Sequence, residues 1–399
     1  MRHEHIIWFR CQQMIELCRV LLAAIISIFY KKCPIWLITE RGTDARDNGY
    51  WFFVYLKKNH PDIKSYYIIS KESSDRKRLA DYTDSIIDYR SMQHYVMLWR
   101  ANCLISTHIQ GYFPFAGLGL WFKKVCPSYR RKTHISLKHG VTCNYTTFLD
   151  YKNTTLDLLI AATRPEYEYF KKKYLYPEDH LALTGFCRYD QLNHYKIKHQ
   201  ILVMPTWREW LYKSNDVLLS DYVRTYVDFL NDSNLHRLLA HQNLNLVFYP
   251  HHEMQPYLDV FLKKVHHENI IIANQHEYDV QQLLKESIIL ITDYSSVLFD
   301  FVYMKKNVIY YQFDKEYFYN YHYNAGWFDY NSLGSVVSTK NELLKCLNTI
   351  LDNDCHIKSI YMQRIKEYFV YHDNNNCERV YSAIRKVLNS KSTIGTIVQ

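Results

Sequence analysis

The chain has 399 residues, of which 48% are hydrophobic and 22% are charged, and its formal net charge is +9. That length is too great for one small core and predicts two domains, while the charged content is ordinary for a soluble protein. The positive charge favours anionic partners such as phosphopolymers, nucleotides or acidic lipid, but no RNA-binding or helix-turn-helix signature accompanies it, which argues against nucleic acid.

The first predicted element is the N-terminal segment, residues 1–32, in which residues 15–30 read IELCRVLLAAIISIFY. Its uncharged part, Val20 to Tyr30, is too short to span a bilayer as a helix, and it lacks the small-residue processing site of a cleavable signal. Basic residues flank it at Arg10, Arg19, Lys31 and Lys32. The pattern fits a helix lying in the interface of an anionic membrane, and it fits equally an ordinary helix packed on the first domain.

A second stretch suited to a membrane surface runs from Tyr112 to Lys132. It combines aromatic residues with a basic cluster: Lys123, Lys124, Arg130, Arg131 and Lys132. Exposed aromatic rings beside cations suit a membrane surface. A mobile basic loop beside a substrate-binding site is the alternative interpretation of this stretch.

Short β-rich runs alternate with helical stretches through the rest of the chain. In the first half the predicted strands are Trp36–Thr39, Tyr66–Ile69, Cys103–Ser106, Ile135–Leu137, Leu158–Ala161 and Leu181–Thr184. In the second half they are Ile201–Met204, Leu244–Tyr249, Ile270–Ala273, Ile288–Thr292, Val308–Tyr311 and Val336–Val337. Helices are predicted at Asn48–Asn59, Ser91–Ala101, Leu219–Asn231, Gln255–His266, Asn341–Leu351, Ser359–Phe369 and Glu378–Leu388. This alternation indicates an α/β fold with parallel sheets and right-handed crossovers.

The alternation falls into two successive α/β halves, which predicts domains at residues 33–195 and 196–388 after the N-terminal helix. The boundary is expected in the polar stretch from Asn193 to Gln200. The last helices are candidates to cross back to the first half, and the tail from Asn389 to Gln399 is expected to be loose.

The most informative stretch is residues 288–314, IILITDYSSVLFDFVYMKKNVIYYQFD. It predicts a strand–turn–helix–strand unit with Asp293, Ser295 and Ser296 at the carboxyl end of the first strand. Open α/β sheets bind ligands at that edge, and hydroxyls with backbone N–H groups at a helix N-terminus suit a phosphate. A phosphate seat at the two serines is one interpretation, and simple capping of the helix is the other.

Several signatures of other enzyme classes are absent from the sequence. It has no D-x-D triplet at a strand end, no P-loop, no G-x-S-x-G elbow and no G-x-G-x-x-G, which argues against a P-loop NTPase and a dinucleotide oxidoreductase. None of the ten cysteines forms a C-x-x-C pair, so a zinc ribbon is not expected and reduced thiols in the cytoplasm are the simplest interpretation.

A set of short motifs runs along the chain in a definite order. They are K-H-G at 138–140, G-F-C-R-Y-D at 185–190, P-T-W-R at 205–208, Y-P-H-H at 249–252, T-D-Y-S-S at 292–296, G-W-F-D-Y at 326–330 and D-N-N-N-C-E-R-V at 373–380. Each motif alone is weak. The ordered set, which covers roughly residues 35–385, resembles the CDP-glycerol glycerophosphotransferase family, the enzymes that build teichoic-acid-like poly(glycerol phosphate).

The resemblance implies a GT-B fold, in which two Rossmann-like domains face a central cleft, with the acceptor in the N-terminal domain and the nucleotide donor in the C-terminal one. It implies that an acceptor hydroxyl attacks the β-phosphorus of CDP-glycerol and that CMP leaves, in teichoic-acid-like or capsule polymer synthesis. The implied partners are CDP-glycerol, a lipid-linked or phosphopolymer acceptor and an anionic membrane surface. The implied location is peripheral, at the cytoplasmic face of the bacterial cell membrane.

Alternatives to this reaction stay open. A polyol-phosphate transferase that uses CDP-ribitol and a GT-B glycosyltransferase would share the fold. A membrane-associated binding protein without turnover is the non-enzyme alternative. Whether the enzyme adds one unit or polymerises is also open.

The resemblance assigns catalytic roles to two histidines. His139 would be the general base, although family members usually continue with G-T-P where this chain has Gly140, Val141 and Thr142. On the residues alone, a surface-loop histidine would be the better interpretation, because the chain has 20 histidines. His251 would contact the donor phosphates or protonate the leaving CMP, with His252 as the alternative by one position.

The resemblance also places residues at the donor phosphates and nucleotide: Thr206, Arg208, Asp293, Ser295 and Ser296. An arginine at a strand end can make bidentate contacts with a diphosphate. Arg188 and Asp190 resemble a pair that fixes the domain-linking loop through a structural salt bridge. No metal ligands are predicted and no cofactor is assigned, with a divalent cation left open.

Overall fold

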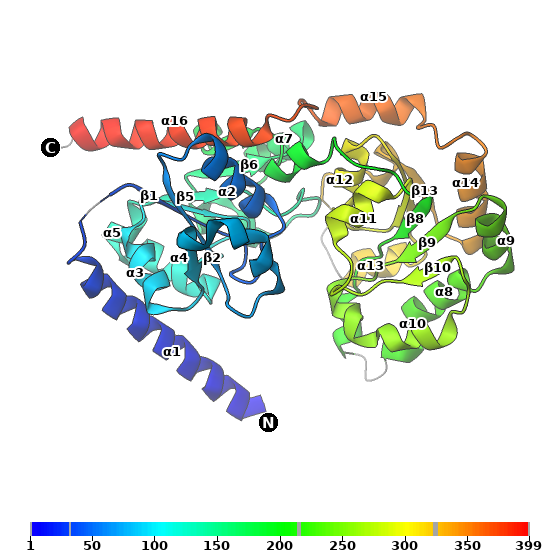
Figure 1. Ribbon diagram of the computed structural model, residues 1–399, viewed down its shortest axis with the longest axis horizontal. Coiled ribbons are helices and arrows are strands. Elements are labelled where there is room, and N and C mark those ends of the chain that lie inside the picture. The colour runs from blue at the N-terminus through cyan, green and yellow to red at the C-terminus, as the bar shows by residue number, and fades with distance from the viewer. Residues whose placement is uncertain (1, 32, 214–216, 322–325, 398–399) are drawn as a thin grey trace. The chain divides into compact units, whose positions relative to one another are not determined.

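The computed structural model describes residues 2–31, 33–213, 217–321 and 326–397. It divides the chain into two compact α/β units, coloured along the chain in Figure 1. The first unit comprises the described residues of Met1–His139, Thr147–Asp190 and Asp373–Gln399, and the second comprises those of Gly140–Thr146 and Gln191–His372. This division differs from the predicted domains, 33–195 and 196–388, at the short segment 140–146 and at the C-terminal helix.

The first unit is built on a parallel sheet whose seven strands, among the described residues, run in the order β3-β2-β1-β4-β5-β6-β7. The strands are β1 (Ile35–Thr39), β2 (Lys64–Ile69), β3 (Ile86–Asp88), β4 (Cys103–Ser106), β5 (Thr133–Ser136), β6 (Leu158–Ala161) and β7 (Leu181–Leu183). Every residue of β1, β4 and β6 is buried, as expected where helices cover both faces of a parallel sheet. Since β1 lies between β2 and β4, the strand order reverses there, and ligands bind at the carboxyl edge of such a sheet.

The helices of the first unit cover this sheet. They are α1 (Arg2–Ser27), α2 (Asn48–Asn59), α3 (Met92–Arg100), α4 (Ala116–Val125), α5 (Pro127–Arg130), α6 (Tyr151–Thr154), α7 (Arg164–Lys172) and α16 (Asn376–Ile397). Their starts carry ordinary capping signals: the Ser91 hydroxyl accepts the His94 N–H at α3, and the Thr163 hydroxyl accepts the Glu166 N–H at α7.

The second unit repeats the architecture with a parallel sheet that has, in the described part of the chain, six strands in the order β10-β9-β8-β11-β12-β13. The strands are β8 (Gln200–Val203), β9 (Asn245–Phe248), β10 (Ile270–Ile272), β11 (Ile289–Thr292), β12 (Asn307–Tyr311) and β13 (Ser335–Val337). The helices are α8 (Asp221–Leu230), α9 (Ser233–His241), α10 (Leu258–Lys264), α11 (Val280–Glu286), α12 (Leu298–Tyr303), α13 (Lys315–Tyr321), α14 (Lys340–Leu351) and α15 (Ser359–Tyr368). The α/β class predicted from the alternation is confirmed in both units.

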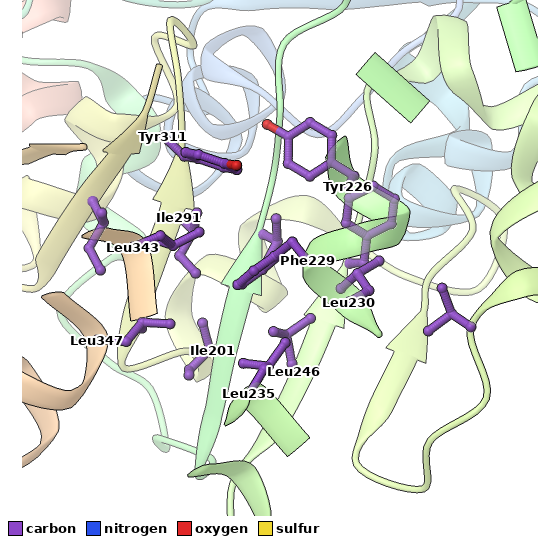
Figure 2. Close-up of a cluster of buried hydrophobic side chains, with 14 of the residues drawn as sticks. Ile201, Tyr226, Phe229, Leu230, Leu235, Leu246, Ile291, Tyr311, Leu343 and Leu347 are labelled. Atoms are coloured by element: carbon purple, nitrogen blue, oxygen red, sulfur yellow. The ribbon is translucent and has the colours of Figure 1, made fainter. Parts of the chain in front are cut away.

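One face of the second sheet carries a large apolar core, shown in Figure 2. Side chains of β8, β9 and β11 meet those of α8, α9 and α14 there, among them Ile201, Tyr226, Phe229, Leu246, Ile291 and Leu347. Each of these side chains is almost fully withdrawn from water. Because the core fixes β8 and β11 side by side, it also fixes the loops that leave their carboxyl ends.

The C-terminal helix belongs to the first unit because its start is held by Asp190. The Asp190 carboxylate accepts the backbone N–H groups of Asn376 (2.8 Å) and Cys377 (2.9 Å) and the Asn376 side-chain amide (2.7 Å). This corrects the predicted salt bridge between Arg188 and Asp190, since the carboxylate caps α16 instead. The expectation of a loose tail is wrong as far as Ile397, because α16 continues to that residue, and 398–399 lie outside the described residues.

Two features escaped the sequence prediction. Strand β3 was not predicted, because it has three residues and follows a polar 3₁₀ segment, Ser74–Ser85. In the predicted basic surface, Lys123 and Lys132 are buried rather than exposed. The Lys132 ammonium donates to the carbonyls of Trp99 and Ala101, both at 2.6 Å, so this lysine holds a turn of the fold.

The N-terminal helix α1 is packed on α3 along one side. The buried Glu16 carboxylate accepts from Arg90 Nε at 2.9 Å, and the Trp99 indole donates to the Val20 carbonyl at 2.7 Å. The other side of the segment exposes apolar residues: Met14, Ile15, Leu21, Leu22, Ile25, Ile28, Phe29 and Tyr30. Within the described residues no helix has the length and apolar character needed to cross a bilayer.

Of the cations predicted to flank this segment, Lys32 lies outside the described residues, as does Met1 at the other end of the predicted range. Arg19 is half-exposed and pairs with Glu16 at 3.6 Å. The helix is therefore attached to the first unit by one face and exposes an apolar face, so it combines features of both interpretations of the sequence.

Candidate functional site

The T-D-Y-S-S motif lies at the carboxyl end of β11, between β8 and β12 in the second sheet. The strand–turn–helix–strand prediction is confirmed by β11, α12 and β12. Asp293 is fully buried, and its Oδ1 accepts the backbone N–H groups of Thr206 (2.9 Å) and Tyr294 (2.6 Å). The carboxylate thus ties the turn after β11 to the loop after β8, and it does not cap α12.

Arg208 of the P-T-W-R motif is fully buried beneath this turn. Its guanidinium donates from Nε to Asp314 Oδ2 at 2.7 Å, from Nη2 to Asp314 Oδ1 at 3.0 Å and from Nη1 to the Thr206 carbonyl at 2.6 Å. Its Nη1 also lies 2.8 Å from Asp293 Oδ2. Burial alone would lower the pKa of Arg208, and the two carboxylates outweigh it and hold the pKa above its ordinary value.

This arrangement corrects the expected direct contact between Arg208 and a diphosphate. A guanidinium that is withdrawn from solvent and engaged by two carboxylates has no surface left for a ligand. Its structural effect is indirect: it neutralises Asp293, which in turn orients the turn that bears the serines.

Three further residues of this edge, Thr206, Ser295 and Ser296, carry hydroxyl groups. All three residues are half-buried. Ser295 Oγ accepts the Val297 N–H at 3.3 Å, so it partly satisfies the start of α12. The Thr206 hydroxyl has no hydrogen-bond partner among the described residues. The Thr206 hydroxyl is itself buried, so the two serine hydroxyls are the groups of this set that are better placed to meet a ligand.

The loop that follows His139 packs directly against this turn. A Cβ atom added to Gly140 would lie 2.8 Å from Ser296 Oγ, so any larger residue there would require the serine side chain to shift. Farther along the loop, the Trp327 indole donates to the Thr142 carbonyl at 2.6 Å and the Trp327 backbone N–H to the Cys143 carbonyl at 3.2 Å. The K-H-G, T-D-Y-S-S and G-W-F-D-Y motifs, far apart in the sequence, thereby meet around Gly140–Thr146.

His251 follows β9 at the same edge of the second sheet. Its Nδ1 accepts the Glu253 backbone N–H at 3.3 Å, which places the proton of the neutral ring on Nε2. His252 is more exposed, and its Nε2 lies 3.1 Å from Glu253 Oε1. The geometry favours His251 over His252 as the histidine that is oriented by its loop. No cluster of three or more histidine, cysteine or carboxylate side chains suited to a metal occurs in the described ranges.

In the first unit, His139 follows β5 on a loop whose carbonyls are held by other elements. The buried Asn48 amide donates to the Lys138 carbonyl at 2.7 Å, and Arg188 Nη1 donates to the His139 carbonyl at 2.8 Å. The same guanidinium pairs with Asp47 Oδ1 at 2.7 Å. Arg188 is therefore a positioning residue for the loop that carries His139.

Lys138, the residue before His139, also holds this loop in place. Its φ of 55° is in the left-handed region, which a non-glycine residue adopts only when its surroundings hold it there. Its ammonium forms a buried ion pair with Glu166 and lies 4.4 Å from the centre of the Phe170 ring. The side chain of Lys138 is thus buried in the first unit, whereas the next residue, His139, is exposed.

The ring of His139 is stacked on a second imidazole that the sequence analysis did not single out. His108 follows β4, the neighbour of β5, and the two ring centroids are 4.7 Å apart with an interplanar angle of 9°. Desolvation, then the nearby charges of His108 and Arg188, lowers the pKa of His139. The residue keeps an exposed surface, which limits the size of this shift but not its direction. His139 is therefore neutral near pH 7, the form that accepts a proton.

Comparison with known proteins identifies the family. The family model for CDP-glycerol:poly(glycerophosphate) glycerophosphotransferase matches residues 21–386. The minor teichoic acid biosynthesis protein GgaB of Bacillus subtilis (strain 168) is 32% identical in an alignment of length 384 that covers 92% of this chain and 41% of GgaB. The chain thus spans less than half the length of that relative. The teichoic acid poly(glycerol phosphate) polymerase of Bacillus spizizenii is 24% identical over 78% of this chain and 82% of its own length.

Solved structures agree on the fold. The wall teichoic acid polymerase TagF superposes with a TM-score of 0.66 at 17% identity, over 96% of this chain and 97% of that one. A further TagF structure, soaked with CDPG, has a TM-score of 0.62 at 16% identity over 96% and 97% of the two chains. MnaA of S. aureus, solved with UDP, has a TM-score of 0.56 at 15% identity over 90% and 97%.

These likenesses confirm the GT-B fold of two Rossmann-like units. The sequence motifs, the paired α/β units and the extent of the family match agree with one another. The chain belongs to the CDP-glycerol:poly(glycerophosphate) glycerophosphotransferase family.

Proposed function

We propose that this chain transfers glycerol phosphate from CDP-glycerol to a hydroxyl of a lipid-linked or polymeric acceptor and releases CMP, in teichoic-acid-like or capsule polymer synthesis. The observation that carries the proposal is the meeting of motifs within the second unit, where the turn that bears Ser295 and Ser296 packs on Gly140, the last residue of the K-H-G motif, and Trp327 donates to the Thr142 carbonyl. Membership of the family and the CDPG soak of TagF support the choice of donor.

The proposed base is His139. Its neutral imidazole takes the proton of the acceptor hydroxyl as the oxygen attacks the β-phosphorus of CDP-glycerol. The new bond joins the acceptor oxygen to the β-phosphorus, and the bond from that phosphorus to the bridging oxygen breaks and leaves CMP. Arg188, Asn48 and Lys138 support this role, because they fix the backbone on both sides of the histidine.

The proposed donor site lies at the carboxyl edge of the second sheet. Ser295, Ser296 and Thr206 supply hydroxyl donors to the phosphates, and His251 supplies its Nε2–H to the developing charge on the leaving CMP. Asp293 and Arg208 act from beneath by orienting the turn.

The experiment that tests this function is a donor panel with the purified chain. We expect CMP release from CDP-glycerol in the presence of a lipid-linked saccharide or a short glycerol phosphate oligomer, and much slower release from CDP-ribitol. UDP-sugars serve as the control for the glycosyltransferase alternative, which would release a nucleoside diphosphate. Turnover of CDP-ribitol or of a UDP-sugar alone would replace the proposed donor, and binding without turnover of any donor would favour the binding-protein alternative.

We also propose that the chain acts at the cytoplasmic face of the bacterial cell membrane as a peripheral protein bound to anionic lipid. The apolar face of α1 and the residues that follow it support this, since Ile25, Ile28 and Phe29 are 58%, 77% and 85% exposed. The formal net charge of +9 acts in the same direction.

Replacing Ile25 and Phe29 together by glutamine is expected to weaken binding to anionic vesicles by at least about 10-fold, because each side chain loses much of its burial energy in the interface. Vesicle flotation measures the effect. The matched control replaces Leu219 and Leu262 by glutamine, two exposed leucines of the second unit, and should bind like the parent chain. Equal binding by both variants would contradict the proposed contact.

A further inference from the structure

The first unit holds a cavity of about 380 Å³ that no step of the proposed reaction uses. Its lining is strongly basic: Leu120, Lys123, Lys124, Arg130, Lys152, Asn153, Thr155 and Asp157. Four of these side chains are cations and one is a carboxylate. The residues come from α4, α5 and α6 and from the turn that enters β6.

The cavity lies at the opposite edge of the sheet from His139. Arg130 precedes β5 and Asp157 immediately precedes β6, so both stand at the amino ends of these parallel strands. His139 follows the carboxyl end of β5. The length of the strands therefore separates the cavity from the loop that bears the proposed base.

The charge in the cavity is unbalanced. Asp157 is already engaged, since its Oδ1 pairs with Lys391 at 2.7 Å and its Oδ2 accepts the His134 backbone N–H at 2.8 Å. The other charged side chains of the lining are cations, and three of them, Lys124, Arg130 and Lys152, are exposed. An anion in the cavity would face several cations without a free carboxylate to repel it.

Lys123 is the buried member of the group. It is 6% exposed, and its ammonium donates to the Thr155 carbonyl at 2.5 Å. An ammonium has three N–H donors, and within the described residues this carbonyl is its one acceptor. Burial lowers the pKa of Lys123 to about 8, and the positive charge of Lys391 adds to this, while the Asp157 carboxylate only partly offsets it. A bound anion would add negative charge beside this ammonium and supply acceptors for its remaining N–H groups.

We propose that this cavity is a binding site for a phosphate group, with Lys123 at its base and Lys124, Arg130 and Lys152 at its rim. A phosphate has several acceptor oxygens and can engage more than one of these cations at once. The amide of Asn153 and the hydroxyl of Thr155 complete a polar lining. The phosphate can come from a soluble phosphate compound or from the headgroup of an anionic glycerophospholipid, which share this chemistry.

The test compares the parent chain with the variant K124Q/R130Q/K152Q. These residues are exposed, so the variant is expected to fold, which circular dichroism checks. The matched control is K58Q/K64Q/K77Q, which removes three exposed lysines of the same unit outside the cavity and lowers the net charge equally. Inorganic phosphate is titrated by calorimetry at constant ionic strength, and phosphatidylglycerol and phosphatidylcholine vesicles are compared by flotation.

We expect saturable phosphate binding by the parent and the control, and affinity at least about 10-fold lower in the cavity variant, since three charge contacts are lost. An additional fall in binding to phosphatidylglycerol vesicles in that variant alone would identify the lipid headgroup as the source, and unchanged flotation would identify a soluble phosphate compound. Absence of saturable binding by the parent, or equal losses in both variants, would overturn the proposal. None of these measurements needs turnover, so they stand apart from the test of the proposed reaction.

Discussion

Replacing His139 by alanine is expected to slow CMP release from CDP-glycerol by about 10²–10⁴-fold, the range that a positioned general base contributes. Donor binding should be retained, because the groups proposed to hold the phosphates lie on the loops after β8 and β11. Single-turnover kinetics with a saturating acceptor measures the rate, and calorimetric titration with CDP-glycerol measures the binding.

The control for this experiment is His276→Ala, which removes an exposed histidine of the second unit and should leave the rate unchanged. A second test of His139 as the general base is the pH profile of kcat/KM in the parent chain. Desolvation lowers the pKa of His139. The nearby charges lower it further, and they come from His108, Arg188, Lys138 and Arg41. The midpoint of the acid limb of this kcat/KM profile is therefore expected at a pH below 6.5, the ordinary pKa of histidine, so activity persists at mildly acid pH. An unchanged rate in His139→Ala would remove this histidine from the chemistry.

The sequence was sufficient to locate the loops of the site because local patterns carry that information. An apolar run followed by T-D-Y-S-S, then an amphipathic segment, predicts a strand, a turn and a helix, and β11 and α12 confirm it. The strands that precede His139 and His251 were located in the same way, although their bounds, Thr133–Ser136 and Asn245–Phe248, differ by one or two residues from the predicted ones. These patterns show where along the chain each strand ends, and a residue that follows a strand end lies at the edge of the sheet.

The partners of the site residues could not be predicted, because they are set by contacts between distant parts of the chain. Arg208 meets Asp314, 106 residues later, and only that contact shows that the guanidinium is occupied. His108 follows its strand in the same way as His139, yet nothing distinguishes it among 20 histidines until β4 and β5 lie side by side. Sequence patterns alone do not carry that adjacency.

The same limit explains the error over Asp190. A neighbouring arginine and aspartate suggested a salt bridge, but in a 3₁₀ turn their side chains diverge. Arg188 turns towards the His139 loop, and Asp190 turns towards the start of α16. One short motif therefore holds both the loop of the proposed base and the C-terminal helix.

The largest expected effect on stability is that of replacing Arg208 by methionine. The substitution leaves the carboxylates of Asp293 and Asp314 without their cation in a buried setting, which is expected to cost about 3–5 kcal/mol in the free energy of unfolding. Denaturant unfolding followed by tryptophan fluorescence, to which the core residue Trp207 contributes, measures the loss. The control is Arg224→Met, which removes the cation from an exposed pair with Asp221 and should cost no more than about 0.5 kcal/mol.

The cause of that loss can be separated from simple packing damage. If the orphaned charges are responsible, converting Asp293 and Asp314 to asparagine in the Arg208→Met background should restore part of the stability, because neutral amides need no cation. If lost packing of the arginine stem is responsible, the added substitutions should destabilise the unit further. Partial recovery would show that Arg208 stabilises the unit by balancing the charges of Asp293 and Asp314, and so helps to hold Asp293 in place against the backbone of Thr206 and Tyr294.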